Sequence, residues 1–379
     1  MLGSNNHLKE KLIRKSQLIY HYIRKHDSVS KQDIVVGLKL SLPTVTQNLQ
    51  YLMELGLIDA SKKIQNTGGR NATAYTYVKN TKMAIGLYLT RNHITAVAVN
   101  LSGNIEAMEK VRVPFDLDDD NYLKKMGEVV ETVKSRIQLE DENLLGVGIS
   151  VQSLVSEEGE VVIYGLTLDF TGKTRAQIAK YIPYKNRLFH DSEAAGYAEV
   201  WIDREIKNAF YISLCNSVGG AVLVDNSIYS GDTLKGGEIG HMIAVREGGE
   251  RCYCGKYGCF DTVCRATKLD EVTDGNLEDF FISVKKKDSK AVQVWDKYLD
   301  ELALGIHNIR MLFDGKVIIG GYVGAYIDEY LDVLAEKVDK WSPFEEDRAI
   351  DYIRPCKYKV EAAAAGAAIH YIDDLFDSI

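Results

Sequence analysis

The residues with the clearest chemical potential in this sequence are three cysteines and a histidine. Cys252, Cys254 and Cys259 lie in CYCGKYGC with a C-x-C-x4-C spacing, and ten residues separate His241 from Cys252. Three thiolates and one imidazole are the ligands of a closed, tetrahedral zinc site of the structural type. A redox pair is disfavoured because C-x-C is not the usual C-x-x-C spacing and no thioredoxin-like pattern surrounds it. We therefore expect one structural Zn²⁺ per chain, rather than three unrelated thiols beside a core histidine.

The composition indicates the compartment in which such a site would work. The first residues, MLGSNNHLKEKLIRK, contain no apolar segment of the signal-peptide kind. The longest apolar stretch, EAAAAGAAIHYI, is too short and too interrupted to span a bilayer. We therefore expect a cytoplasmic protein with no membrane partner, in which thiols stay reduced and a disulfide is disfavoured. A chain of 379 residues should divide into two or three domains.

The first eighty residues differ from the rest in charge and in pattern. Residues 1–80 hold twelve Lys and Arg against five Asp and Glu, whereas the whole chain has a net charge of −8. A basic segment on an acidic body is suited to contact with nucleic-acid phosphates, although a solvated surface would look the same by charge alone.

The elements expected in this segment decide between those interpretations. Apolar residues at helical spacing predict a first helix over 8–26. Ser30 and Asp33 resemble a capping box that opens a second helix ending near Gly37, and Ser41 with Pro43 opens a third. Two β-prone segments, ASKKI and TAYTYV, follow around the turn QNTGGRN. Three helices and a glycine-tipped hairpin predict a winged helix-turn-helix over residues 1–80, in preference to a small helical dimerisation module.

In that interpretation the third helix would enter the major groove of operator DNA. Its short polar side chains suit base edges and phosphates, and the wing tip could reach a minor groove or a phosphate. The predicted DNA contacts are Ser41, Thr44, Gln47, Asn48 and Arg70. Because such heads read paired half-sites, we expect a homodimer or a dimer of dimers.

The remainder of the chain has the pattern of two α/β lobes. Expected elements are a hairpin from residue 82, helices over 122–137 and 175–181, strands over 144–151 and 186–190, a second hairpin from 208, helices over 290–313 and 323–340, and a last helix over 360–379. We expect lobe 1 over 81–190, with 360–379 packing back on it, and lobe 2 with the zinc site over 191–359. A cleft between lobes is the default ligand site.

The motifs GGEIGHM and C-x-CGxxGCxD resemble the signature of the ROK family, which comprises repressors, open reading frames and sugar kinases. Gly68-Gly69-Arg70 resembles the wing of the family's repressors. The resemblance covers nearly the whole chain. It implies an actin-like, sugar-kinase-type fold of two lobes behind a winged helix-turn-helix. It also implies that the His241 and three-cysteine set holds zinc.

The resemblance further implies a sugar site in the cleft. The positions that match the family's sugar-binding motifs are Asp191, Glu238, His241 and Asp261. Carboxylates accept hydrogen bonds from vicinal hydroxyls, and a metal-bound imidazole can offer its other nitrogen. The family usually has Asn before the first Asp, where this chain has His190, and Glu at the last position, where it has Asp261. We therefore include His190 among the expected sugar contacts and expect unusual specificity.

The loops that would bind ATP in a family kinase are altered. Tyr88 stands where the kinases have the Asp of Asp-x-Gly-Gly-Thr, Thr90 stands at one of its glycines, and Asn216 replaces the Thr of Gly-Thr-Gly. Asp191 matches the general base, but a base without a phosphate cradle has nothing to transfer. We therefore expect no kinase activity. The sequence predicts a DNA-binding regulator, most simply a repressor, that responds to a sugar or sugar phosphate. The alternatives are a sugar kinase with an added head and a regulator that answers to a protein partner.

Overall fold

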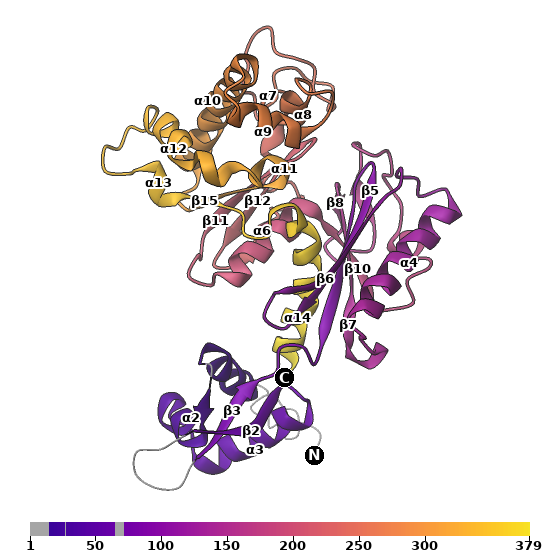
Figure 1. The fold of residues 1–379 in the computed structure, drawn as a ribbon, viewed down its shortest axis with the longest axis vertical. Coiled ribbons are helices and arrows are strands. Elements are labelled where there is room, and N and C mark those ends of the chain that lie inside the picture. Colours follow the sequence, from indigo (N-terminus) through magenta and orange to yellow (C-terminus); the bar gives the residue numbers. More distant parts are fainter. Residues whose placement is uncertain (1–14, 27, 65–71) are drawn as a thin grey trace.

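The computed structural model describes residues 15–26, 28–64 and 72–379. Figure 1 shows a small head connected to two larger lobes. In the head, residues 15–25 are helical and are followed by α2 (Lys31–Leu38) and α3 (Leu42–Glu54). The strands β1 (Val29–Ser30), β3 (Ala72–Tyr77) and β2 (Ile58–Ile64) form an antiparallel sheet in that order. This is the element order of a winged helix-turn-helix.

The start of α2 follows the predicted capping box, and the helix ends one residue beyond Gly37, close to the predicted stop. Ser30 Oγ accepts a hydrogen bond from Asp33 N at 3.2 Å, and Asp33 Oδ2 accepts one from Ser30 N at 2.8 Å. The helix continues through Gly37, and the left-handed residue that ends it is Lys39, with φ 52°. A Cβ on Gly37 would lie 2.5 Å from Tyr22 Oη. Gly37 is therefore required for the close approach of Tyr22, not for the helix stop.

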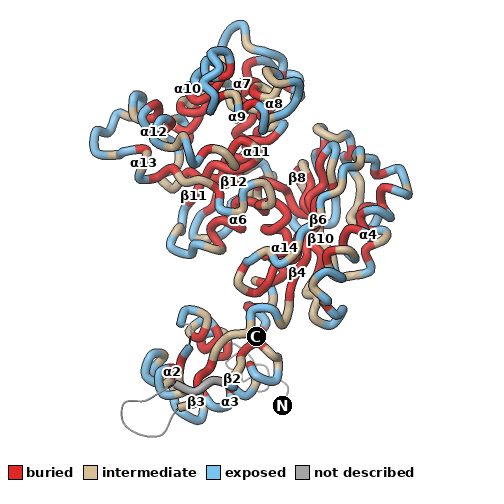
Figure 2. Tube along the Cα trace, in the orientation of Figure 1, coloured by how far each residue is buried: buried red, intermediate tan, exposed pale blue. Residues whose placement is uncertain are grey.

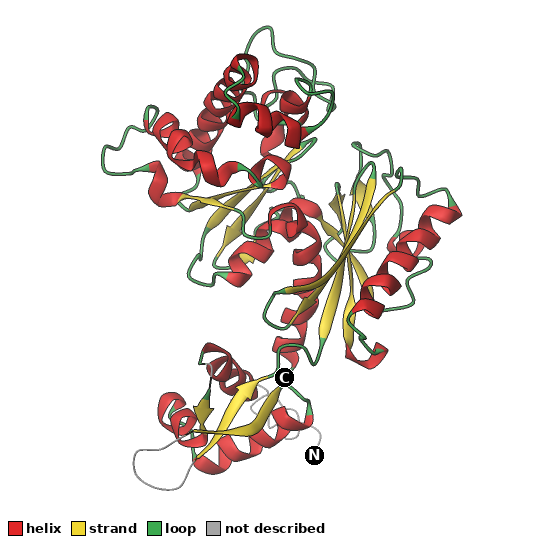
Figure 3. Cartoon of the chain, viewed as in Figure 1, coloured by secondary structure: helices red, strands yellow, loops and turns green. Residues whose placement is uncertain are grey.

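Lobe 1 contains a five-stranded sheet with helices on both faces (Figure 3). Its strand order is β10 (Asn186–His190), β7 (Leu144–Val151), β4 (Met83–Leu89), β5 (His93–Asn100) and β6 (Ile105–Arg112). The strands over 144–151 and 186–190 are confirmed, while β6 was not expected. The helix α4 (Asp120–Arg136) contacts β5 and β6, and α14 (Ala362–Ser378) contacts β4, β7 and β5. The smaller elements are η1 (Asp141–Asn143), β8 (Leu154–Val155), β9 (Val162–Tyr164) and α5 (Arg175–Ile178).

Lobe 2 contains a second five-stranded sheet. Its order is β13 (Ser227–Ile228), β12 (Val218–Val224), β11 (Ala209–Leu214), β14 (Lys316–Gly320) and β15 (Ile353–Pro355). The longest helix of the lobe is α10 (Ser289–Leu312), which agrees with the helix expected over 290–313. The smaller elements are η2 (Ile239–His241), α7 (Asp261–Cys264), α8 (Thr267–Asp270), α9 (Leu277–Lys285), α13 (Ala349–Tyr352) and η4 (Lys359–Glu361).

The single helix expected over 323–340 is wrong. The segment divides into α11 (Gly321–Gly324), η3 (Ile327–Tyr330) and α12 (Leu331–Asp339). The breaks coincide with two aromatic contacts: Tyr326 stacks on Phe281 at 4.1 Å between ring centroids, and Tyr330 lies 5.1 Å from Trp295. Packing against the lobe core therefore overrides the local helical pattern.

Both lobes meet at α6 (Asp191–Ile202), which contacts α14 of lobe 1 and the strands β11 and β12 of lobe 2. Figure 2 shows α14 and α6 as largely buried elements between the lobes. One hydrophobic cluster runs without a break from the head, including Tyr20 and Ile23, to Trp201 and Phe376 of the body. The head is thus joined to the body by shared core packing. None of the helices in the described part of the chain has the length and apolar character needed to cross a membrane.

Candidate functional site

A pocket lies where the carboxyl end of β10 meets the start of α6, with lobe 2 opposite. It encloses about 530 Å³ of empty space, its mouth included. Lobe 1 and α6 contribute Gln152, Ser153, Leu154, Tyr164, Leu166, Thr167, His190, Asp191 and Ser192, and lobe 2 contributes Ser213, Ser217, Val218, Gly219, Glu238, His241 and Tyr253. The pocket therefore brings together four of the five predicted sugar contacts: His190, Asp191, Glu238 and His241.

Asp191 is almost fully buried, and both of its carboxylate oxygens have hydrogen-bond donors. Tyr88 Oη donates to Oδ2 at 3.1 Å, and Ser192 N donates to Oδ1 at 2.8 Å. Gln152 Nε2 in turn donates to Tyr88 Oη at 3.2 Å. Burial, and then the charge of Asp191, raise the pKa of Tyr88 well above its usual value, so the phenol stays a neutral donor. Tyr88, which stands at the Asp of the kinase pattern Asp-x-Gly-Gly-Thr, thus contacts Asp191 directly.

His190 lies between two carboxylates. Its Nε2 is 3.5 Å from Asp191 Oδ1, and its Nδ1 is 3.9 Å from Glu193 Oε2. Ser230 Oγ donates to the other oxygen of Glu193 at 2.6 Å. Glu193 does not line the pocket itself. His190 Nδ1 is buried without a hydrogen-bond partner among the described residues, and the ring presents an imidazole where the ROK pattern has an amide.

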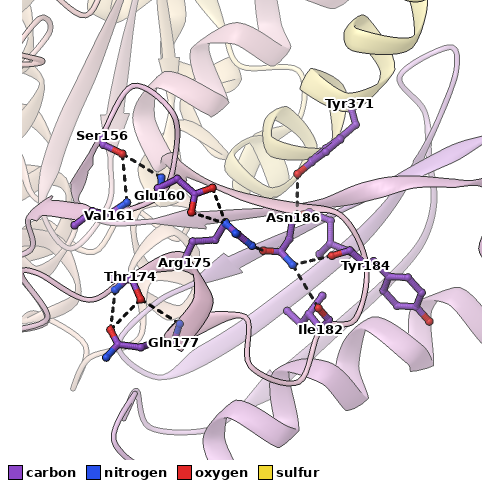
Figure 4. A network of polar contacts seen from close by, with 11 residues as sticks. Ser156, Glu160, Val161, Thr174, Arg175, Gln177, Ile182, Tyr184, Asn186 and Tyr371 are labelled. Atoms are coloured by element: carbon purple, nitrogen blue, oxygen red, sulfur yellow. Dashed lines mark hydrogen bonds and ion pairs between the residues drawn. The ribbon is translucent and has the colours of Figure 1, made fainter.

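The strand that carries His190 is anchored at its other end by a polar network (Figure 4). Arg175 Nε lies 2.8 Å from both carboxylate oxygens of Glu160, and Arg175 Nη1 donates to Asn186 Oδ1 at 2.9 Å. Asn186 Nδ2 donates to the carbonyl of Tyr184 at 2.7 Å. These bonds hold the first residue of β10, so the strand delivers His190 and Asp191 to a fixed place at its carboxyl end.

The three cysteines and His241 form one cluster. Their ligand atoms all lie within 4.8 Å of one another. Cys254 Sγ is 3.7 Å from Cys259 Sγ, and Cys252 Sγ is 3.7 Å from His241 Nδ1. A tetrahedral ion with Zn–S bonds of about 2.3 Å requires ligand atoms roughly 3.6–3.8 Å apart, so the donor set and the spacing fit Zn²⁺. Burial raises the pKa of the Cys252 thiol to about 12. A bound divalent cation would lower this pKa, because it stabilises the thiolate.

The metal cluster and the pocket share His241. With Nδ1 toward the thiols, its Nε2 lies 3.2 Å from Tyr253 Oη. Tyr253 lines the pocket and was not predicted. A signal existed, because Tyr253 stands between two cysteines whose side chains both turn toward one centre. The second nitrogen of His241 was expected to face a sugar, whereas Tyr253 faces it here.

Asp261 does not line the pocket. Its side chain is 1% exposed, and Oδ1 accepts a hydrogen bond from Val218 N at 2.8 Å. Burial raises its pKa, against the opposing effects of that hydrogen bond and of Arg265. Its Oδ2 is buried without a hydrogen-bond partner among the described residues, so a direct sugar contact through that oxygen stays a prediction. The short aspartate holds Val218, which does line the pocket.

A second cavity lies beside the altered phosphate loops and encloses about 1650 Å³ of empty space, its mouth included. Thr90, Asn216 and Tyr322 are among its lining residues, and Gln152 and Thr167 line both this cavity and the first pocket. Thr90 is buried, and its Oγ1 donates to the carbonyl of His93 at 3.2 Å. Side chains thus stand where backbone amides would have to approach a phosphate.

The predicted DNA contacts do not all face solvent. Ser41 Oγ caps α3 by accepting from Thr44 N at 3.3 Å, and Gln47 is exposed. Asn48 is 1% exposed and donates from Nδ2 to the carbonyl of Thr44 at 2.8 Å. Its prediction as a base contact is wrong, because the side chain turns into the head. Arg70 lies outside the described residues. Exposed polar side chains of α3 that the sequence analysis did not select are Thr46 and Gln50.

Comparisons with known proteins agree along most of the chain. A family model described as the ROK family matches residues 84–373. A xylose repressor of Caldicellulosiruptor bescii is 20% identical over 393 residues, covering 98% of each protein. A glucokinase of Halalkalibacterium halodurans is 24% identical over 265 residues, covering 62% of this chain and 80% of the enzyme. The solved structure of a ROK family transcriptional regulator, a homologue of the Escherichia coli MLC protein, covers 98% of both chains with a TM-score of 0.73 and 20% identity.

Proposed function

The chain belongs to the ROK family, and we propose that it is a sugar-responsive, DNA-binding transcription regulator, most simply a repressor of genes for carbohydrate uptake or catabolism. The observation that carries this proposal is the hydrogen bond from Tyr88 to Asp191. A kinase needs Mg²⁺ and the transferred phosphoryl group held close to its catalytic base. A buried phenol there leaves Asp191 able to accept a hydroxyl of a bound sugar but not to serve phosphoryl transfer.

The charges around the pocket favour an uncharged effector. Among its lining residues are the acids Asp191 and Glu238, and no lysine or arginine belongs to the lining set. Carboxylates oriented by protein donors are good acceptors for vicinal hydroxyls. An added phosphate would meet like charge without a cationic partner. An uncharged sugar therefore fits better than a sugar phosphate.

Zn²⁺ is the proposed cofactor, held by His241, Cys252, Cys254 and Cys259. When bound, it would supply a rigid cross-link and no reaction chemistry. The segment that the ion would cross-link follows Glu238 and contains Tyr253, and both residues line the pocket. The metal set would therefore fix one wall of the pocket. The partners of the head would be operator DNA, read by a homodimer or a dimer of dimers.

Two measurements on the purified full-length protein test the proposal. Duplexes selected from a random-sequence pool should bind with a strong salt dependence, because basic heads release counterions. D-xylose and D-glucose, tested beside their phosphates, should include an uncharged sugar that changes DNA affinity by about 5- to 150-fold, the usual range of allosteric coupling. Absence of specific duplex binding would refute the regulator.

The alternative is a sugar kinase with an added head, favoured by the retention of Asp191 at the position of the general base. ATP consumption with the same sugars distinguishes the two. We expect turnover no faster than that of an Asp191→Ala variant. Robust, Asp191-dependent turnover would make the protein an enzyme and would contradict our interpretation of Tyr88.

A further inference from the structure

The helix α6 begins in the pocket and ends at the head. Asp191 and Ser192, its first two residues, line the pocket. Trp201 lies ten residues further on, about 15 Å along the helix axis. The guanidinium of Arg24, from the first helix of the head, lies over the Trp201 ring with Cζ 5.3 Å from the centroid. One helix therefore contacts both the candidate ligand site and the candidate DNA-binding unit.

Its surroundings prevent α6 from bending or sliding on its own. Ten of its twelve residues are buried. A Cβ on Gly366 of α14 would lie 1.8 Å from the carbonyl oxygen of Ala194, and a Cβ on Gly196 would lie 3.2 Å from Ala221 Cβ of β12. Buried Glu199 accepts hydrogen bonds from Lys357 N at 2.8 Å and from Tyr358 N at 3.0 Å, in the segment after β15. Both lobes pack tightly against the helix. A movement of one lobe relative to the other therefore displaces α6 as a rigid body.

The head end of α6 is an ordered aromatic stack. Trp201 Nε1 donates to Asp373 Oδ1 of α14 at 3.0 Å, and its ring is near-parallel to Phe376, at 13° and 6.2 Å between centroids. Arg24 Cζ lies 4.5 Å from the Phe376 centroid, so one guanidinium covers both rings. Gln17 Nε2, also from the head, donates to the carbonyl of Asp377 at 2.7 Å. The first helix of the head is thus seated on the ends of α6 and α14.

We propose that α6 is the rigid element that carries the state of the pocket to the head, and that Arg24 on Trp201 and Phe376 is the contact that receives it. This inference rests on the proposed function. A ligand on Asp191 and Ser192, or closure of lobe 2 around it, shifts α6 with its neighbours. The displaced Trp201 alters the seat of Arg24, and the head changes its orientation relative to the body. A packed contact that has two discrete arrangements can convert a small shift of α6 into a change of DNA affinity.

The first test compares Arg24→Met with Arg204→Met in the full-length protein. Arg204 also lies over Trp201, at 5.5 Å, but belongs to the body, so it is a matched control. Arg24→Met should retain sugar binding by thermal shift and retain DNA binding. Its sugar-dependent change in DNA affinity, with D-xylose and D-glucose as probes, should fall below about twofold, while Arg204→Met keeps most of the wild-type response. A full wild-type response in Arg24→Met would overturn the inference.

The second test needs no ligand. A Cβ on Gly219 would lie 2.3 Å from Ser192 Oγ, so Gly219→Val forces the Ser192 side chain in the first turn of α6 to move. A Cβ on Gly240 would lie 2.1 Å from the backbone carbonyl oxygen of Val218, so Gly240→Val is a more severe control change outside α6. Both variants are first checked for folding by circular dichroism. Amide exchange over residues 15–25 should rise about tenfold in Gly219→Val and in Arg24→Met, but not in Gly240→Val. Unchanged exchange over 15–25 in Gly219→Val would overturn the inference whether or not any sugar binds. A rise there combined with no sugar response in the wild type would refute only the sugar-sensing function.

Discussion

The pH dependence of stability should be governed in part by His370, a residue of α14 that lies between the pocket and the head. Its ring stacks between Phe189 and Tyr197, with centroid distances of 4.6 Å and 4.2 Å. Its Nε2 is buried and has no hydrogen-bond partner among the described residues. Burial, with a smaller contribution from Arg187, lowers the pKa of His370 to about 3. The imidazole is therefore neutral in the folded protein at pH 5 and above.

The sign of the effect follows from this shift. Unfolding returns His370 to its ordinary pKa of about 6.5, so below that pH the unfolded chain binds a proton that the folded chain does not. The contribution of neutral His370 to the free energy of unfolding is therefore fully present above pH 6.5. It is lost as the pH falls toward the pKa in the folded protein. Between pH 7 and pH 5 the loss is about 1.4 kcal/mol per unit below pH 6.5, or about 2 kcal/mol in all. Because pH 5 lies well above the native pKa, this magnitude depends on the pKa of the unfolded chain.

Urea unfolding of the wild type and of His370→Phe at pH 7 and pH 5 measures the effect. The phenyl ring keeps the stack and removes the titration, so the variant controls for all other groups. We expect the free energy of unfolding to fall by about 2 kcal/mol more in the wild type than in the variant. Equal losses in the two proteins would show that His370 titrates normally in the fold, and the interpretation of its burial would be refuted.

Three further predictions follow from the site and the head. Cys254→Ser should reduce bound zinc, measured by elemental analysis, from about one equivalent per chain and lower the thermal midpoint; unchanged zinc would contradict the assigned ligand set. Gln47→Ala should weaken duplex binding by about 1–3 kcal/mol without loss of stability. Asn48→Ala should instead lower the free energy of unfolding by about 1–2 kcal/mol. If Asn48→Ala weakened duplex binding and Gln47→Ala lowered stability, Asn48 would face the DNA. Gly37→Ala should cost about 1–3 kcal/mol, measured by urea unfolding, and combining it with Tyr22→Leu should recover part of this loss; additive losses would exclude the contact.

Features determined by neighbours in the sequence could be predicted well. The capping box of Ser30 and Asp33 depends on residues three positions apart, and the strands over 144–151 and 186–190 are short runs bounded by turn residues. The metal set was predictable because three of its four ligands occupy eight residues, and a loop that short brings its thiols together. The ROK signature extended these local patterns to the two-lobed fold.

The directions of single side chains depended on contacts between distant segments. Asn48 was expected at the DNA, but the packing of α3 turns it inward. Asp261 lies outside the pocket lining, and its short side chain reaches the amide of Val218, 43 residues earlier. No local pattern in the sequence placed Tyr88 on Asp191, 103 residues away, or Arg24 on Trp201. The sequence by itself therefore determined which chemistry the chain can assemble, because its ligands and caps are local. Only the tertiary structure decided which side chains meet across the lobes, because those contacts arise from packing that no short segment encodes.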